Sequence, residues 1–86
     1  MLSIVSTEVK IVNLESVLKY LVRHRNNDDL HSGMFYFESG RVAFIDARFD
    51  KSLCVTIYGA EKQFHCSTVK EVLSLFDGDS LIKYET

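Results

Sequence analysis

The chain has 86 residues, of which 47% are hydrophobic and 26% charged, and its formal net charge is −2. A chain this short supports one thin hydrophobic core and leaves few side chains for a deep catalytic cleft, so we expect one domain over residues 1–86 and no enzyme. The acidic balance also disfavours a protein that coats nucleic acid electrostatically.

The first third of the chain predicts a strand followed by a helix. Residues 2–12 alternate apolar and polar side chains, which is the period of a half-buried strand. Asn13 suits a helix N-cap, and apolar residues then recur at helical spacing. These residues are Leu14, Val17, Leu18, Leu21 and Val22. We expect the helix to end near His24 or Arg25, before a polar turn at residues 26–29.

A β-hairpin is expected next, with Ser39-Gly40 as a two-residue turn in which glycine supplies a positive φ. This register places Glu38 opposite Arg41 as a pair of opposite charges. It also divides the apolar residues of the hairpin between two faces. One face receives Phe35, Phe37, Val42 and Phe44, and the other receives Met34, Tyr36, Ala43 and Ile45.

A second hairpin is expected over residues 53–66, with a loop at residues 59–62. Its register places Ile57 and Phe64 on one face. It places Cys54 and Cys66 on opposite faces, which excludes a disulfide between them. Cys54 and His65 could share a face, and a histidine can activate a thiol. Since no third group is identifiable, simple cross-strand packing is the favoured interpretation of this pair.

The chain then predicts a helix and a last strand. Thr68 and Glu71 have the spacing of a capping box, Gly78 suits a helix end, and residues 81–85 predict a last short strand. The expected order is therefore β-α-β-β-β-β-α-β. This order predicts a small two-layer α+β domain, with two helices packed on an antiparallel or mixed sheet.

We expect neither a metal nor a cofactor. The cysteines and histidines form no close ligand pairs, and the four glycines are too scattered for a phosphate-binding loop. Residues 1–8 lack the basic region and the long apolar run of a signal peptide. No segment has the ~18 apolar residues that a membrane span needs. The reduced cytoplasm is therefore the expected compartment, with no membrane association.

The hairpin at residues 34–45 carries the functional hypothesis, because both of its faces are apolar. If both helices cover the same side of the sheet, the other side stays open, and an exposed apolar patch usually marks an interface. One helix on each side would instead bury both faces. The open-face alternative predicts a non-enzymatic protein-interaction module: a homodimer, or a small inhibitor or adaptor that docks on a larger protein. The expected contact residues are Met34, Tyr36, Ala43 and Ile45.

A small nucleic-acid-binding regulator is the alternative function. Its contacts would be the basic residues of the first helix, Lys19, Arg23 and Arg25. Positive charge near a helix C-terminus also complements the helix dipole, which explains the same residues without a ligand.

The chain is similar in outline to PatA N-terminal-type regulatory domains. The similarity rests on the hydrophobic spacing of Leu14, Val17 and Leu18, the segment at residues 33–42, Val72-Leu73 and Gly78. The hairpin at residues 53–66 departs from that outline, and no function follows from the resemblance.

Overall fold

The computed structural model describes residues 13–86, and the strand expected at residues 2–12 lies outside this part of the chain. The described residues form two helices and five strands, in chain order α2, β1, β2, β3, β4, α3 and β5. Their bounds are Leu14–Arg23, Ser32–Phe37, Val42–Ala47, Leu53–Ile57, Lys62–Cys66, Val69–Leu75 and Leu81–Glu85, respectively.

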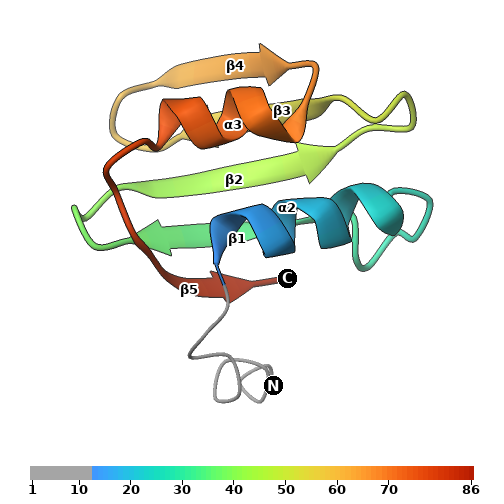
Figure 1. Ribbon diagram of the computed structural model, residues 1–86, viewed down its shortest axis with the longest axis horizontal. Helices are drawn as coiled ribbons and strands as arrows, with labels where there is room; N and C mark the ends of the chain where they lie inside the picture. Colours follow the sequence, from blue (N-terminus) through green and yellow to red (C-terminus); the bar gives the residue numbers. More distant parts are fainter. Residues whose placement is uncertain (1–12) are drawn as a thin grey trace.

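The five strands form one sheet in the order β4-β3-β2-β1-β5 (Figure 1). Every neighbouring pair of strands is antiparallel, so the sheet is not mixed. The first four strands are two hairpins laid side by side, whereas β5 follows α3 and crosses the sheet to pair with β1. The α+β class expected from the sequence is confirmed.

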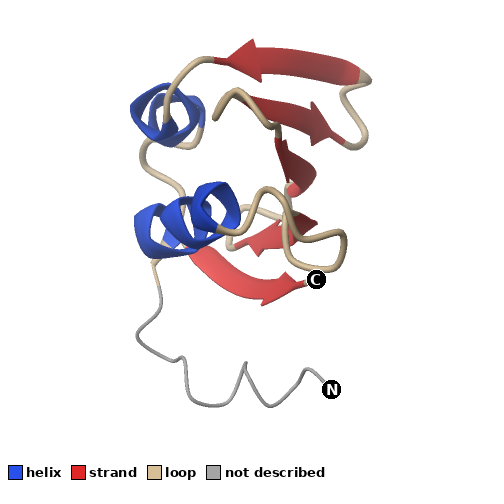
Figure 2. Ribbon diagram, turned by 90° about the vertical axis from the view of Figure 1, so that its right-hand side faces the viewer, coloured by secondary structure: helices blue, strands red, loops and turns tan. Residues whose placement is uncertain are grey.

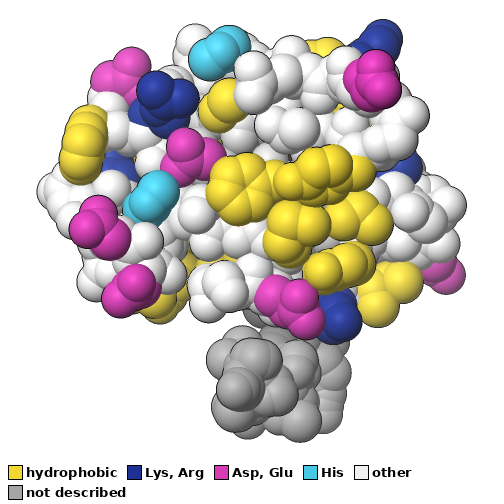
Figure 3. Space-filling view, turned by 180° about the vertical axis from the view of Figure 1, so that it is seen from behind, with side chains coloured by type: hydrophobic (Ala, Val, Ile, Leu, Met, Phe, Trp, Pro, Cys, Tyr) yellow, Lys and Arg dark blue, Asp and Glu magenta, His cyan; other side chains and the backbone are white. Residues whose placement is uncertain are grey.

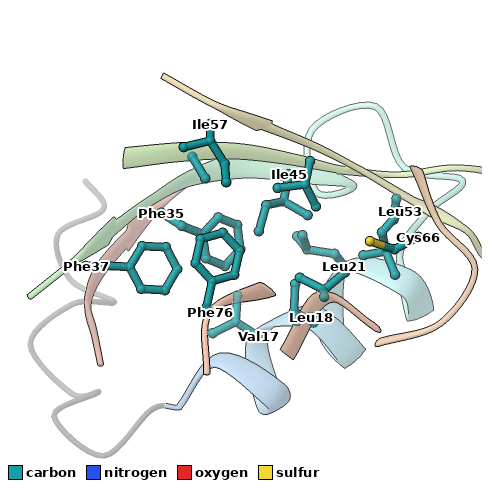
Figure 4. Packing of buried hydrophobic residues seen from close by; sticks show 14 residues of the cluster. Val17, Leu18, Leu21, Phe35, Phe37, Ile45, Leu53, Ile57, Cys66 and Phe76 are labelled. Atoms are coloured by element: carbon teal, nitrogen blue, oxygen red, sulfur yellow. The ribbon is translucent and has the colours of Figure 1, made fainter. Parts of the chain in front are cut away.

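Both helices lie on the same side of the sheet (Figure 2) and contact each other. Their apolar side chains meet the buried face of the sheet in one hydrophobic core (Figure 4). The fully buried members of this core are Leu18, Leu21, Phe35, Ala43, Ile45, Leu53, Val55 and Val72. Because no described helix covers the other side of the sheet, that side is an open face.

Both helices begin directly after the N-cap residues expected from the sequence. The Asn13 side chain accepts a hydrogen bond from the Ser16 N–H at 2.8 Å and satisfies one free donor of the first turn of α2. Thr68 Oγ1 accepts from the Glu71 N–H at 3.3 Å at the start of α3. The Glu71 carboxylate in turn accepts from the Ser67 N–H, one residue before the cap, at 2.7 Å. Thr68 therefore caps the helix as predicted. The reciprocal hydrogen bond to Glu71 comes from Ser67, one residue before the position that a capping box uses.

The register of the first hairpin differs from the prediction by one residue. The turn between β1 and β2 has three residues, 38–40, closed by a hydrogen bond from the Phe37 N–H to the Arg41 carbonyl at 3.0 Å. Gly40 occupies its last position with φ 98°, as expected of a three-residue loop that ends in a left-handed residue. The pairing of Glu38 with Arg41 is therefore wrong.

A one-residue slip exchanges the two faces of a strand, because side chains alternate along it. Tyr36 pairs with Val42, and Phe35 pairs with Ala43. The expected exposure of Ala43 and Ile45 is consequently wrong, since both are 0% exposed in the core under the helices. Val42 and Phe44, expected on the same face as Phe35 and Phe37, lie on the open face instead.

The second hairpin has the predicted faces. Val55 pairs with Phe64 and Leu53 with Cys66, so Ile57 and Phe64 share the core side of the sheet. Cys66 is part of the core, whereas Cys54 faces the opposite side and pairs with His65. Both cysteines are free, as their opposite orientations require.

Candidate interaction surface

The open face of the sheet has an apolar centre made by β1 and β2. Its residues form two neighbouring rows, with Met34 opposite Phe44 in one row and Tyr36 opposite Val42 in the next. All four side chains are partly exposed. Hydrophobic side chains gather at the centre of this face when the molecule is seen from behind (Figure 3). We call Met34, Tyr36, Val42 and Phe44 the open-face patch.

Strands β3 and β4 continue the two rows with more polar residues. Thr56 lies opposite Phe44 and receives a hydrogen bond from Gln63 Nε2 at 3.2 Å. Beyond the end of β3, the Tyr58 N–H donates to the Val42 carbonyl at 3.0 Å, and the Tyr58 side chain is 52% exposed. The apolar centre therefore grades into a polar rim on this side, as protein interfaces do.

A charged rim lies on the other side, on the edge strand β5. The Tyr36 hydroxyl donates to Glu85 Oε1 at 3.1 Å, and Lys83 Nζ lies 3.3 Å from Glu85 Oε2. Lys83 Nζ also lies 4.7 Å from the centroid of the Tyr36 ring. The hydrogen bond to Glu85 raises the pKa of the Tyr36 hydroxyl. These contacts fix the position of Tyr36 and place one positive and one negative side chain beside the patch.

A third row of polar residues borders the patch at the end where β2 finishes. His31 Nδ1 lies 2.7 Å from Asp46 Oδ1, and Asp46 pairs with Cys54 across the sheet. Cys54 pairs in turn with His65, so these two residues share a face as the sequence predicts.

Cys54 and His65 lie side by side in this third row as cross-strand neighbours. No hydrogen bond joins Cys54 to His65 within residues 13–86, and no group of three or more metal-ligating side chains occurs in that range. The other thiol, Cys66, lies in the core, and burial raises its pKa and disfavours the reactive thiolate. The arrangement agrees with cross-strand packing for Cys54 and His65.

Of the three basic residues expected to contact an anion, Lys19 and Arg23 lie on α2 and Arg25 lies two residues beyond its end. Lys19 Nζ pairs with Glu15 at 3.1 Å, one helical turn earlier. Arg25 Nε donates to the Phe49 carbonyl at 3.0 Å, and Arg25 Nη1 donates to the Val22 carbonyl at 2.9 Å. Arg23 is exposed in the last turn of the helix. Two of the three proposed anion contacts thus already have partners in the chain.

Of the four residues expected to contact a partner, Met34 and Tyr36 lie on the open side, where Val42 and Phe44 replace Ala43 and Ile45. The missed signal is the composition of the turn. A two-residue turn with positive φ at both central positions favours Asn-Gly or Asp-Gly, whereas Glu38-Ser39-Gly40 has glycine at the last of three positions. Three-residue loops favour that placement.

Comparisons with protein-family models, with curated proteins and with solved structures found no match for this chain. The outline similarity to PatA N-terminal-type domains therefore finds no support there. No helix within residues 13–86 is long and apolar enough to cross a membrane. The structure itself defines a small α+β domain whose helices cover one side of its sheet.

Proposed function

We propose that this chain is a non-enzymatic protein-interaction module that binds through the open face of its sheet. The observation that carries the proposal is the placement of both helices on one side, which leaves the open-face patch without cover from any described element. Apolar area that stays in contact with water is unfavourable, and a contiguous patch of it usually marks an interface.

The composition of the face supports a protein as the ligand. Protein interfaces are enriched in aromatic residues and methionine at their centres and are polar at their rims. The open-face patch holds Met34, Tyr36 and Phe44, and its borders hold Lys83, Glu85, the His31–Asp46 pair and Gln63. Tyr36 adds a rigid ring whose position is already fixed by Glu85, so little side-chain entropy is lost when it is covered.

The proposal includes a reducing compartment, the cytoplasm, for the chain. Cys54 and Cys66 are free thiols on opposite sides of the sheet, and neither stabilises the fold through a disulfide. Free thiols are the usual state of cysteine in reducing compartments.

The test replaces one aromatic residue of the patch and a matched one outside it. Phe44→Glu places a charge in the centre of the open face, where burial against a partner would be costly. Phe49→Glu makes the same chemical change in the β2–β3 turn, where Phe49 is 75% exposed and lies outside the patch. Each variant is immobilised to capture proteins from a native lysate, its mass in solution is measured, and circular dichroism checks its fold.

We expect wild type and Phe49→Glu to associate equally well with themselves or with a captured protein, and Phe44→Glu to lose that association while keeping its fold. The proposal fails if Phe44→Glu behaves like wild type. It also fails if folded wild-type protein neither self-associates nor captures any protein.

A further inference from the structure

We infer that the partner on the open face is a second copy of this chain, packed sheet against sheet about a twofold axis that runs across the strands. This inference rests on the proposed function and names the occupant of the same surface. It follows from how the apolar rows and the charged rim are arranged relative to each other.

The two apolar rows of the open-face patch can be exchanged by a twofold rotation. Met34 and Phe44 form one row across β1 and β2, and Tyr36 and Val42 form the next. A twofold axis that lies between these rows, in the plane of contact, exchanges them between the two copies. Met34 of each copy then faces Tyr36 of the other, and Phe44 faces Val42. All four patch residues of both copies meet apolar surface, which is the self-complementarity that a symmetric interface requires.

The edge strand β5 places one charged side chain at the end of each row. On β5, Glu85 pairs with Met34 and Lys83 pairs with Tyr36. One apolar row therefore ends in a negative charge, and the other row ends in a positive charge. The axis that exchanges the rows also exchanges these ends. Lys83 of each copy therefore faces Glu85 of the other, twice in the dimer. A partner of one uniform charge would match only half of this rim, whereas a second copy matches all of it.

The size of the open face also favours a second copy as the partner. The molecule measures 30 × 28 × 20 Å along its principal axes, and the sheet face spans the two longer dimensions. A specific interface buries ~800 Å² on each partner. A stable complex must therefore use nearly the whole open face, and a second copy presents a face of the same outline. Two sheets packed this way form a sandwich between outer layers of helices.

The test separates contacts between copies from the contact within one copy. Lys83→Glu gives a chain with two acidic residues at the rim, and Glu85→Lys gives a chain with two basic residues. Each variant alone should dimerise roughly tenfold more weakly than wild type, because like charges meet at two symmetric positions. An equal mixture should regain a dissociation constant within roughly threefold of the wild-type value, since opposite charges meet again in the mixed dimer.

The fold should tolerate both changes. The Lys83 and Glu85 side chains are 47% and 42% exposed, and exposed ion pairs contribute little to folding. Lys70→Glu is the matched control, because it changes net charge like Lys83→Glu but lies on α3, on the other side of the sheet. Sedimentation velocity gives the dissociation constants, and native mass spectrometry with one isotope-labelled variant identifies the mixed dimer.

The inference is supported if wild type and Lys70→Glu are dimers, both rim variants dissociate, and their mixture forms mixed dimers. It is overturned if wild type is a monomer at every concentration, or if the mixture fails to recover. A monomeric wild type that captures a different protein through Phe44 would overturn the second copy as partner and leave the proposed function standing. A monomer that captures no protein would overturn both.

Discussion

Arg41 and Asp79 join the turn between β1 and β2 to the segment that leads into β5. Arg41 Nη2 lies 3.0 Å from Asp79 Oδ2, and the guanidinium lies 4.9 Å from the centre of the Phe76 ring. The same carboxylate accepts hydrogen bonds from the Ser39 hydroxyl at 2.6 Å and the Ser39 N–H at 3.1 Å. Asp79 therefore holds the start of β5 beside β1, which is the arrangement that places Lys83 and Glu85 at the rim of the patch.

Asp79→Ala should destabilise the domain. The Asp79 side chain is only 6% exposed and accepts four hydrogen bonds, from the Ser39 N–H, the Ser39 hydroxyl, Arg41 Nε and the Ser80 N–H. All four donors would lose this partner. We expect the melting temperature to fall by roughly 5–10 °C in a domain of this size. Asp77→Ala is the control, because Asp77 is exposed and should change the melting temperature little. An equal effect of both changes would mean that the Asp79 network contributes nothing.

The same network makes stability depend on acid pH. The hydrogen bond from the Ser39 hydroxyl, followed by the contacts from the Ser39 N–H and Arg41, holds the pKa of Asp79 below its usual value. The unfolded chain, with an aspartate pKa of ~3.9, binds this proton first as the pH falls. The stabilisation is therefore complete above that pH and is lost below it. Melting curves between about pH 6 and 3 should fall less steeply for Asp79→Ala than for wild type.

The corrected register predicts opposite sensitivities for two positions of β2 that lie on opposite faces of the sheet. Ile45 is fully buried under the helices, so Ile45→Ala should cost ~2–4 kcal/mol of unfolding free energy by leaving a cavity. Val42 lies partly exposed on the open face, and Val42→Ala should cost under ~1 kcal/mol in a monomer. Urea denaturation at low protein concentration measures both. The register of β2 would be contradicted if Val42→Ala were the more damaging change.

Gly33 permits the close approach of β5 to β1. A Cβ at this position would lie 2.5 Å from Tyr84 Cε1 and 2.6 Å from the Glu85 carbonyl oxygen, so the backbone of β5 would have to move. We expect Gly33→Ala to cost ~1–3 kcal/mol and to change the near-ultraviolet circular dichroism of the tyrosines.

Gly59→Ala is the comparison for that change. Gly59 has φ 88° and open space around it, so alanine there causes backbone strain without a steric clash. The near-ultraviolet spectrum should stay unchanged. A Gly33→Ala variant with wild-type stability and spectrum would show that β5 does not pack against Gly33.

Tyr84 should make the domain sensitive to alkaline pH. Its hydroxyl is buried without a hydrogen-bond partner among the described residues, and burial raises its pKa to about 12. An unfolded tyrosine ionises near ~10, so stability is complete below that pH and decreases as the pH rises through the interval up to the folded value. Tyr84→Phe should retain wild-type stability or gain up to ~1 kcal/mol at pH 7, and lose less stability above about pH 10. A loss above ~1 kcal/mol at pH 7 would reveal a partner for this hydroxyl.

Local signals in the sequence determined most elements of this protein. Asn13 and Thr68 bond to the backbone a few residues away, so their caps could be read directly from the chain. The α+β class followed from the change of hydrophobic period between strands and helices, and the opposite faces of Cys54 and Cys66 followed from strand alternation.

Tertiary structure decided which surface is open. Packing between segments far apart in the chain determines which side of the sheet the two helices cover. No local sequence pattern specifies that side. The assignment of Ile45 to the core and Phe44 to the open face depended on one extra residue in the turn, because a slip of one residue exchanges the faces of a strand. The placement of Lys83 and Glu85 beside the patch depended on β5 crossing to β1, where contacts such as Arg41–Asp79 hold it.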